Sequence, residues 1–154
     1  VSTLAERVDT SAVMVDKFPK TLEIAIKNAS HNGVSDRVEP MLFDVLSDEN
    51  ALEGKKFDAI LSNPPYIRPE VIENLSDEVK HEPYAAFYGG EDGLIFYNRI
   101  VENYSKFLKD EGFILFEIGY DQADDLKKIA EKHGYSCRIY KDYGGNDRVA
   151  YLKK

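Results

Sequence analysis

The sequence is poor in the residues that build disulfide scaffolds and metal centres. It has a single cysteine, Cys137, so an intramolecular disulfide is excluded, and we expect this residue to be a small strand side chain rather than a nucleophile. Its three histidines, His31, His81 and His133, are widely spaced and have no cysteine beside them at a ligand spacing. We therefore expect no metal site.

Long apolar runs are absent as well. No stretch approaches the length of a membrane-spanning helix, and the first residues lack the basic and then apolar profile of a signal peptide. The expectation is a soluble, cytoplasmic protein. With 154 residues, 43% of them hydrophobic, the chain suits one domain with a buried core.

Basic residues are in the minority. The 28 aspartates and glutamates against 20 lysines and arginines give a formal net charge of −8. Binding along a nucleic-acid backbone relies on clustered lysine and arginine. The charge balance therefore argues against direct nucleic-acid binding and favours a protein or small-molecule substrate, with no membrane partner.

The hydrophobic pattern predicts alternating strands and helices. We expect strands over 11–15, 37–43, 57–62, 112–118, 135–141 and 148–152, and helices over 21–29, 70–80, 93–109 and 121–133. The strand over 57–62 should be buried, Pro40 should lie toward a sheet edge, and Asp121 and Gly134 should cap the last helix. Repeated strand and helix units that close on a hairpin indicate an α/β fold with a mostly parallel sheet and one antiparallel strand.

The most informative segment is Asn63-Pro64-Pro65-Tyr66, which directly follows the strand expected over 57–62. Prolines have no backbone N–H, so the turn presents carbonyl oxygens without competing donors, and the Asn63 carboxamide adds an acceptor. Because Asn63 precedes a proline, it is biased to an extended backbone at the carboxyl end of the strand, where α/β sheets place ligands. Two acceptors aimed at one NH2 group would hold a planar, weakly nucleophilic nitrogen. A rigid turn capped by Asn63 is the alternative.

Further segments follow this tetrad in a characteristic order. They are His81-Glu82-Pro83, Gly89-Gly90-Glu91-Asp92-Gly93-Leu94, Phe96-Tyr97, Glu117-Ile118-Gly119 with Gln122, and Asn146-Asp147-Arg148. With them the chain resembles, over nearly its whole length, the catalytic domain of the release factor glutamine methyltransferases of the HemK/PrmC family. Adenine-N6 DNA methyltransferases and some guanine-N2 RNA enzymes share the tetrad, but the other segments in this order are more specific.

The resemblance implies a Rossmann-like class I methyltransferase fold with S-adenosylmethionine as cofactor. It implies transfer of the methyl group to the side-chain amide of the glutamine in the Gly-Gly-Gln loop of a peptide-chain release factor, which is then the protein partner. Asn63 and the Pro64 carbonyl would be the catalytic groups that hold this amide. Pro65 and Tyr66 would complete the substrate pocket, with Tyr66 as its wall, and Asn63 would also border the cofactor.

Three residues upstream of the tetrad are candidates for cofactor binding. Asp16 ends an expected strand, where a carboxylate can accept both ribose hydroxyls. Asp44 follows the next strand, and in similar enzymes this neighbourhood touches adenine, so Asp44 would accept from the exocyclic amine and Val45 would pack on the ring. The alternatives are an ordinary helix-start acid for Asp16 and a simple loop acid for Asp44.

Other residues of the resemblance are expected to support the site. Glu117 should hydrogen-bond loop backbone rather than act as a base. Glu82-Pro83 and the run over 89–93 would form a flap over the substrate, or the run would simply cap a helix start. Tyr84, Phe87 and Tyr88 should pack this flap, and the stretch over 144–147 needs no role beyond a hairpin turn.

The chain departs from the family pattern at its start. In such folds a strand and a Gly-rich loop precede the acidic strand end by roughly twenty residues, and counting back from Asp16 runs off the sequence. We expect residues 1–154 to be a partial catalytic domain, without this loop or the family's helical N-terminal domain. The absent strand would lie between the strands that end at Asp16 and Asn63. The rival readings are a nucleic-acid amino-methyltransferase and a non-catalytic truncated fragment.

Overall fold

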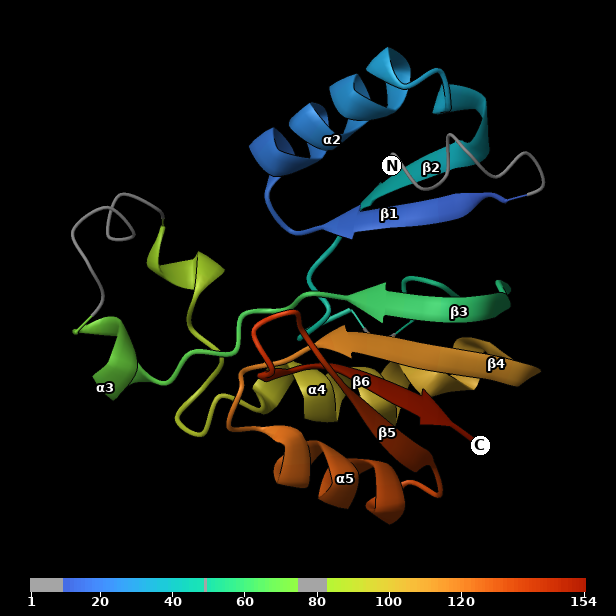
Figure 1. The fold of residues 1–154 in the computed structure, drawn as a ribbon. Helices are drawn as coiled ribbons and strands as arrows, with labels where there is room; N and C mark the ends of the chain where they lie inside the picture. The colour runs from blue at the N-terminus through green and yellow to red at the C-terminus, as the bar shows by residue number, and fades with distance from the viewer. Residues whose placement is uncertain (1–9, 49, 75–82) are drawn as a thin grey trace. The chain divides into compact units, whose positions relative to one another are not determined.

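The computed structural model describes residues 10–48, 50–74 and 83–154 (Figure 1). Its contacts divide the chain into two compact units, Val1–Ala51 and Leu52–Lys154. Each unit has its own sheet, and each is described by itself. In the described ranges no helix is long and apolar enough to cross a membrane.

The first unit is a β-α-β motif. Its elements are β1 (Ala12–Asp16), α2 (Pro19–His31), the short 3-10 turn η1 (Ser35–Arg37) and β2 (Val38–Leu42). The strands pair in parallel from Ala12 opposite Val38 to Asp16 opposite Leu42. Ala29, Val34 and Val38 form a buried cluster in the core of the unit, and the partly buried Met14 packs against it. The strands and the helix predicted over 11–15, 37–43 and 21–29 are confirmed to within two residues at each end.

The second unit contains a four-stranded sheet. Its strands are β3 (Phe57–Ser62), β4 (Leu108–Glu117), β5 (Ser136–Lys141) and β6 (Asp147–Lys153), in the spatial order β3-β4-β6-β5. β3 and β4 are parallel, and β6 runs antiparallel to both of its neighbours. The predicted α/β fold with one antiparallel strand is therefore confirmed. β3 has the predicted bounds, and β4 begins four residues earlier than the strand predicted over 112–118.

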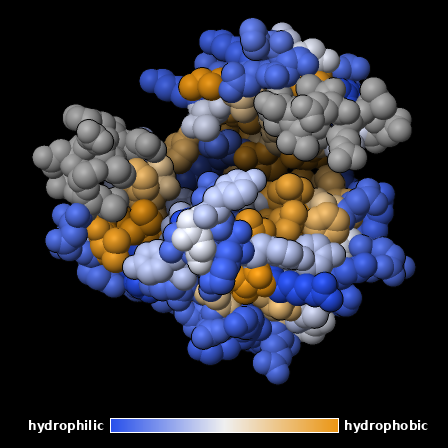
Figure 2. Space-filling model, viewed as in Figure 1, coloured by the Kyte–Doolittle hydropathy of each residue, from blue (hydrophilic) through white to orange (hydrophobic). Residues whose placement is uncertain are grey.

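Helix α5 (Ala123–Lys132) packs on β5 and β6. On the inner face of the helix Leu126, Ile129 and Ala130 are buried, while its outer face is hydrophilic (Figure 2). Burial of each large apolar side chain contributes about 1.5–3 kcal/mol. The helix predicted over 121–133 is confirmed except at its start, because Asp121 lies outside it and pairs instead with Arg68, 2.6 Å away. The expected end at Gly134 is confirmed, since this residue has a left-handed φ of +76°.

The helix predicted over 93–109 is shorter than expected. It consists of α4 (Ile95–Arg99), the π turn η4 (Ile100–Tyr104) and the 3-10 turn η5 (Ser105–Phe107). The segment cannot continue as a helix because Leu108 pairs with Phe57 in the sheet. The apolar stripe within it is nevertheless buried, as helical spacing predicted, at Tyr97, Ile100, Val101 and Tyr104.

Two further expectations are corrected. The helix predicted over 70–80 is reduced to α3 (Pro69–Ile72), and residues 75–80 lie outside the described residues. β3 is not a buried strand, since Leu61 in it is 71% exposed. A strand with a single partner has fewer neighbours to cover its side chains, and in the described ranges β3 pairs with β4 alone. Likewise β1 pairs there with β2 alone.

Candidate functional site

The tetrad leaves the sheet at the carboxyl end of β3. Ser62, the last residue of β3, lies opposite Phe116 of the parallel strand β4, so the tetrad begins beside the end of β4. Pro64 is buried and Pro65 half-buried, whereas Asn63 is exposed. Among the described residues, nothing hydrogen-bonds to the Asn63 carboxamide. Its oxygen is therefore an available acceptor at the sheet edge where α/β folds bind ligands.

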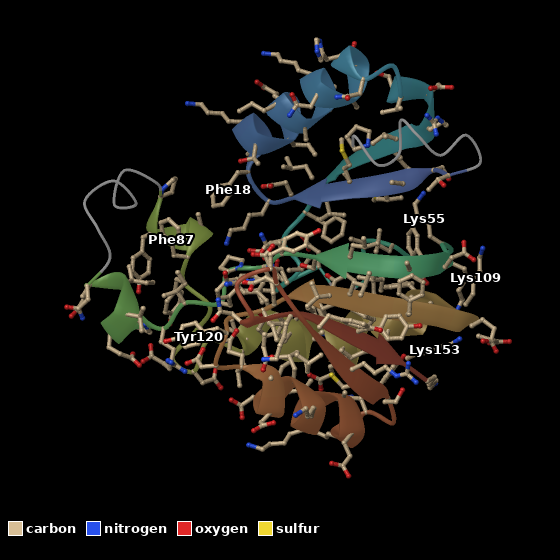
Figure 3. The ribbon with its side chains drawn as sticks, viewed as in Figure 1. Phe18, Lys55, Phe87, Lys109, Tyr120 and Lys153 are labelled. Atoms are coloured by element: carbon tan, nitrogen blue, oxygen red, sulfur yellow. The ribbon has the colours of Figure 1, made fainter. Side chains whose placement is uncertain are left out.

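A short bridge holds the far end of the tetrad. The Ile67 N–H donates to the Phe87 carbonyl (2.8 Å), and the Gly89 N–H donates to the Ile67 carbonyl (3.0 Å). The turn is thus tied to β3 on one side and to the segment over 87–89 on the other. Figure 3 labels Phe87 at this end of the sheet, together with Tyr120 of the loop that follows β4.

Two glycines of the run over 89–93, Gly89 and Gly93, lie directly on Tyr66. A Cβ at Gly89 would come within 2.6 Å of the Tyr66 Cα, and a Cβ at Gly93 within 2.5 Å of the Tyr66 carbonyl oxygen. Asp92 accepts a hydrogen bond from the Leu94 N–H (2.9 Å), just before α4 begins. The run therefore contacts the tetrad and bonds the backbone just before α4, while its role as a flap over the substrate stays a prediction.

The side chain of Gln122 connects this run to the tetrad. It is 2% exposed and lies in the turn between β4 and α5. Its Nε2 donates to the carbonyls of Tyr66 (3.2 Å) and Gly93 (3.1 Å). Its Oε1 accepts from the Gly119 N–H (2.9 Å) and the Tyr97 hydroxyl (3.3 Å). Both donors and both acceptor sites of the carboxamide are therefore used.

Tyr97 supports Gln122 from the core. Its hydroxyl also donates to the main-chain carbonyl of Glu117 (3.0 Å), so the proton lies within reach of two acceptors. Burial raises the pKa of Tyr97 well above its ordinary value, with smaller contributions in the same direction from Tyr66 and Glu117. The hydroxyl consequently stays protonated and remains a donor. The prediction that Glu117 hydrogen-bonds loop backbone stays a prediction, because the Glu117 atom that bonds to Tyr97 is its main-chain carbonyl oxygen.

The C-terminal hairpin reaches the tetrad through Arg148. Its Nη1 lies 3.4 Å from the Tyr66 hydroxyl and 3.1 Å from the Ile118 carbonyl, and its Nε lies 3.5 Å from Asp142 Oδ2. Asp142 Oδ1 accepts from the N–H groups of Gly144 (2.8 Å) and Asn146 (3.0 Å), which confirms the predicted hairpin turn. The turn therefore also helps to place an arginine beside Tyr66, a role that was not predicted for it.

Two of the cofactor candidates in the first unit lie at one sheet edge. The Phe43 N–H donates to the Asp16 carbonyl (3.2 Å), which joins the ends of β1 and β2. Asp16 Oδ1 accepts from the Phe18 N–H (2.7 Å), and Asp44 Oδ1 accepts from the Leu46 N–H (2.9 Å). These bonds fix both carboxylates, and Val45 follows Asp44 directly. Asp16 and Asp44 are thus brought together in the first unit, while Asn63, Pro64, Pro65 and Tyr66 are brought together in the second.

The remaining expectations concern side chains around the flap. Tyr84 and Tyr88 stack on each other with their ring centroids 5.3 Å apart, and their packing against a flap, with Phe87, stays a prediction. His81 and Glu82 lie outside the described residues.

Partial burial raises the pKa of the Cys137 thiol, in keeping with a small strand side chain. In the described part of the chain, no group of three or more metal-ligating side chains occurs.

Replacing Gly93 by alanine should destabilise the protein more than replacing Gly145. Both glycines have a left-handed φ, +75° and +84°, so each alanine incurs about 1–2 kcal/mol of backbone strain. Only at Gly93 would the added Cβ also meet main-chain atoms of Tyr66, since Gly145 has open space around it. Urea unfolding of the two variants measures the difference. Equal losses would show that the approach of Gly93 to Tyr66 does not constrain the turn.

Comparison with known proteins places the chain among methylases. The family model of the Eco57I restriction-modification methylases matches residues 8–140. A release factor glutamine methyltransferase of Aquifex aeolicus is 38% identical over 154 residues, which is 100% of this chain and 54% of that protein. Its counterpart in Clostridium botulinum is 43% identical over 130 residues, 83% of this chain and 46% of that protein. The chain thus spans about half the length of these curated relatives.

The fold agrees with these similarities. The crystal structure of a methyltransferase from Pyrococcus furiosus aligns with a TM-score of 0.68 at 19% identity, over 99% of this chain and 66% of that one. The Rossmann-like class I methyltransferase fold is thereby confirmed. On the matched family model the chain belongs to the Eco57I-type methylases, and over most of its length it is similar to release factor glutamine methyltransferases, the HemK/PrmC proteins that its motifs resemble.

Proposed function

We propose that this protein transfers a methyl group from S-adenosylmethionine to the side-chain amide nitrogen of the glutamine in the Gly-Gly-Gln loop of a peptide-chain release factor. The observation that carries the proposal is the exposed Asn63 carboxamide, unpartnered among the described residues, at the carboxyl end of β3. The tetrad behind it is anchored at both ends. The relatives with 38–43% identity are named for this reaction.

The acceptor chemistry follows from the tetrad. The lone pair of an amide nitrogen is delocalised, so the nitrogen is a poor nucleophile. The Asn63 oxygen and the Pro64 carbonyl would each accept one N–H of the amide and hold the nitrogen with its lone pair facing the methyl donor. Positioning of this kind replaces a strong general base. The proton lost from the methylated nitrogen passes to water, and no covalent intermediate with the protein forms.

The polar groups of the first unit fit the cofactor. Ribose hydroxyls and an adenine amine are hydrogen-bond donors, and Asp16 and Asp44 present carboxylate acceptors at adjacent strand ends. Asp16 would bind the ribose, Asp44 the exocyclic amine, and Val45 the adenine ring, while Asn63 would border the reactive end. When bound, S-adenosylmethionine supplies a methyl group made electrophilic by a cationic sulfur.

A nucleic-acid substrate is the main rival, because the matched family model is named for restriction-modification enzymes. The charges of the chain disfavour it. Lysines labelled in Figure 3 gather at the opposite end of the sheet from the tetrad, and two of them form ion pairs, Lys109 with Asp58 (2.8 Å) and Lys153 with Glu111 (3.0 Å). Neutralised lysines contribute little to binding a phosphate backbone.

The substrate is tested with the protein expressed from its complete reading frame. Incubation with S-adenosylmethionine and a folded release factor should add one methyl group to the glutamine of the Gly-Gly-Gln loop, as located by tandem mass spectrometry. A factor with this glutamine changed to asparagine is the matched control and should stay unmodified. Methylated adenine or guanine in DNA and RNA controls, with the factor untouched, would favour the rival.

Asn63→Ala should remove most methyl transfer and leave cofactor affinity within a few-fold. The carboxamide addresses the acceptor nitrogen, and loss of such positioning typically lowers turnover by ~10²-fold or more. Calorimetric titration with S-adenosylmethionine and the transfer assay measure the two effects separately. Equal collapse of both quantities would mean that Asn63 is structural.

Asp16→Ala should have the opposite profile. A ribose contact is present in both the ground state and the transition state, so its loss should raise the KM for the cofactor and change saturated turnover less. Asp36→Ala is a suitable control, because this exposed acid lies in η1, before the start of β2 and away from the carboxyl ends of β1 and β2. A fall in saturated turnover at constant KM would contradict the ribose assignment.

A further inference from the structure

Tyr66 is held at two points by side chains that come from distant parts of the sequence. Its carbonyl accepts from Gln122, 56 residues downstream, and its hydroxyl lies beside Arg148, 82 residues downstream. We propose that Gln122 and Arg148 are positioning residues, which act through Tyr66 to orient the acceptor pocket. The inference rests on the proposed function and adds two residues that do not themselves touch the substrate.

The first point of attachment is rigid because the main chain of Gln122 is itself fixed by hydrogen bonds. Its N–H donates to the Gly119 carbonyl (3.1 Å), and its own carbonyl accepts from the Leu126 N–H (3.0 Å) at the start of α5. The side chain is buried and satisfied at all four of its hydrogen-bonding positions. A rotation of the Tyr66 carbonyl would leave a buried amide proton without a partner, which is costly in an apolar interior.

The second point of attachment fixes the ring of Tyr66. Arg148 is the second residue of β6 and contacts the Ile118 carbonyl as well as Asp142, so its guanidinium is held from two sides. Its side chain is 32% exposed, in contrast to the buried Gln122. Replacing the arginine is therefore less disruptive to the core than replacing the glutamine.

These contacts matter for the pocket because the two prolines leave the backbone of the tetrad little other conformational freedom. The rings of Pro64 and Pro65 fix φ at both residues, so the direction of the Pro64 carbonyl depends on how the chain continues through Tyr66. Anchoring the carbonyl and the ring of Tyr66 sets that continuation. An error of about 1 Å in the position of a reacting group can lower the rate by ~10²-fold.

The experiment compares two variants with a control in the complete protein. Gln122→Glu keeps an acceptor for Gly119 but removes both donors to Tyr66 and Gly93, while Arg148→Ala removes the contact to the ring. Asn98→Asp is the matched control, because the Asn98 amide donates to the Leu94 carbonyl (3.1 Å) and, in the described ranges, makes no hydrogen bond to the tetrad. Turnover, the KM for the release factor, cofactor affinity and the melting temperature are measured for each variant.

We expect both variants to lower kcat by roughly 10-fold to 100-fold, with KM and cofactor affinity within about 3-fold of the wild type. Asn98→Asp should lower the melting temperature and leave kcat unchanged. Wild-type kcat in Gln122→Glu and Arg148→Ala, at a melting temperature lowered as in the control, would overturn the proposal. Should Gln122→Glu fail to fold, Arg148→Ala carries the same test.

A double-mutant cycle shows whether Arg148 acts through Tyr66. If it does, adding Arg148→Ala to Tyr66→Phe should cost little further kcat, because the hydroxyl that the arginine holds is already gone. Independent, multiplying losses would overturn the assignment of Arg148. The proposed function fails separately, since in that case the wild-type protein would not methylate the release factor at all.

Discussion

The buried carboxamide of Gln122 is the constraint on which the rest of the site depends. Because both of its N–H groups are committed to carbonyls, the chain at Tyr66 and the chain at Gly93 must lie within hydrogen-bonding reach of one atom. That requirement leaves no room for a side chain at Gly93. The oxygen of Gln122 in turn accepts from the buried hydroxyl of Tyr97, whose pKa is raised by that burial.

The polar groups of the site are therefore of two kinds: buried groups whose hydrogen bonds are made within the protein, and an exposed group whose hydrogen-bonding atoms are available. Every polar atom of Gln122 is paired, whereas the Asn63 carboxamide is exposed and lacks a partner among the described residues. A group that binds a ligand must keep its hydrogen-bonding atoms free. It must also be held in place, because ordering a flexible group on binding weakens the affinity for the ligand and poor positioning lowers the rate of reaction. The paired network beneath the tetrad supplies rigidity, so that the free acceptor at its edge can be both available and fixed.

Sequence patterns predicted those parts of this arrangement that are local. Hydrophobic periodicity placed the strands within a few residues, and the tetrad was assigned to the carboxyl end of β3 because proline and asparagine act on their own backbone. Sequence patterns failed where contacts with residues distant in the sequence decide the local structure. Leu108 has helical spacing with Tyr104 but pairs with Phe57, and Asp121 is taken by Arg68 instead of capping α5. Gln122 and Arg148 could be noticed only as members of a family motif. Their hydrogen bonds to Tyr66 span 56 and 82 residues, and no periodic sequence pattern predicts such contacts.

The distribution of charge bears on which substrate such a site would meet. Protein and nucleic-acid acceptors both offer an NH2 group on a planar carbon, so the tetrad alone does not distinguish them. The distinction must come from the surface around it. A duplex would require a row of free cations near the carboxyl ends of β3 and β4, where instead Arg68 is paired with Asp121 and Arg148 with Asp142. A protein loop needs no such row, and the net charge of −8 then limits nonspecific association with nucleic acid.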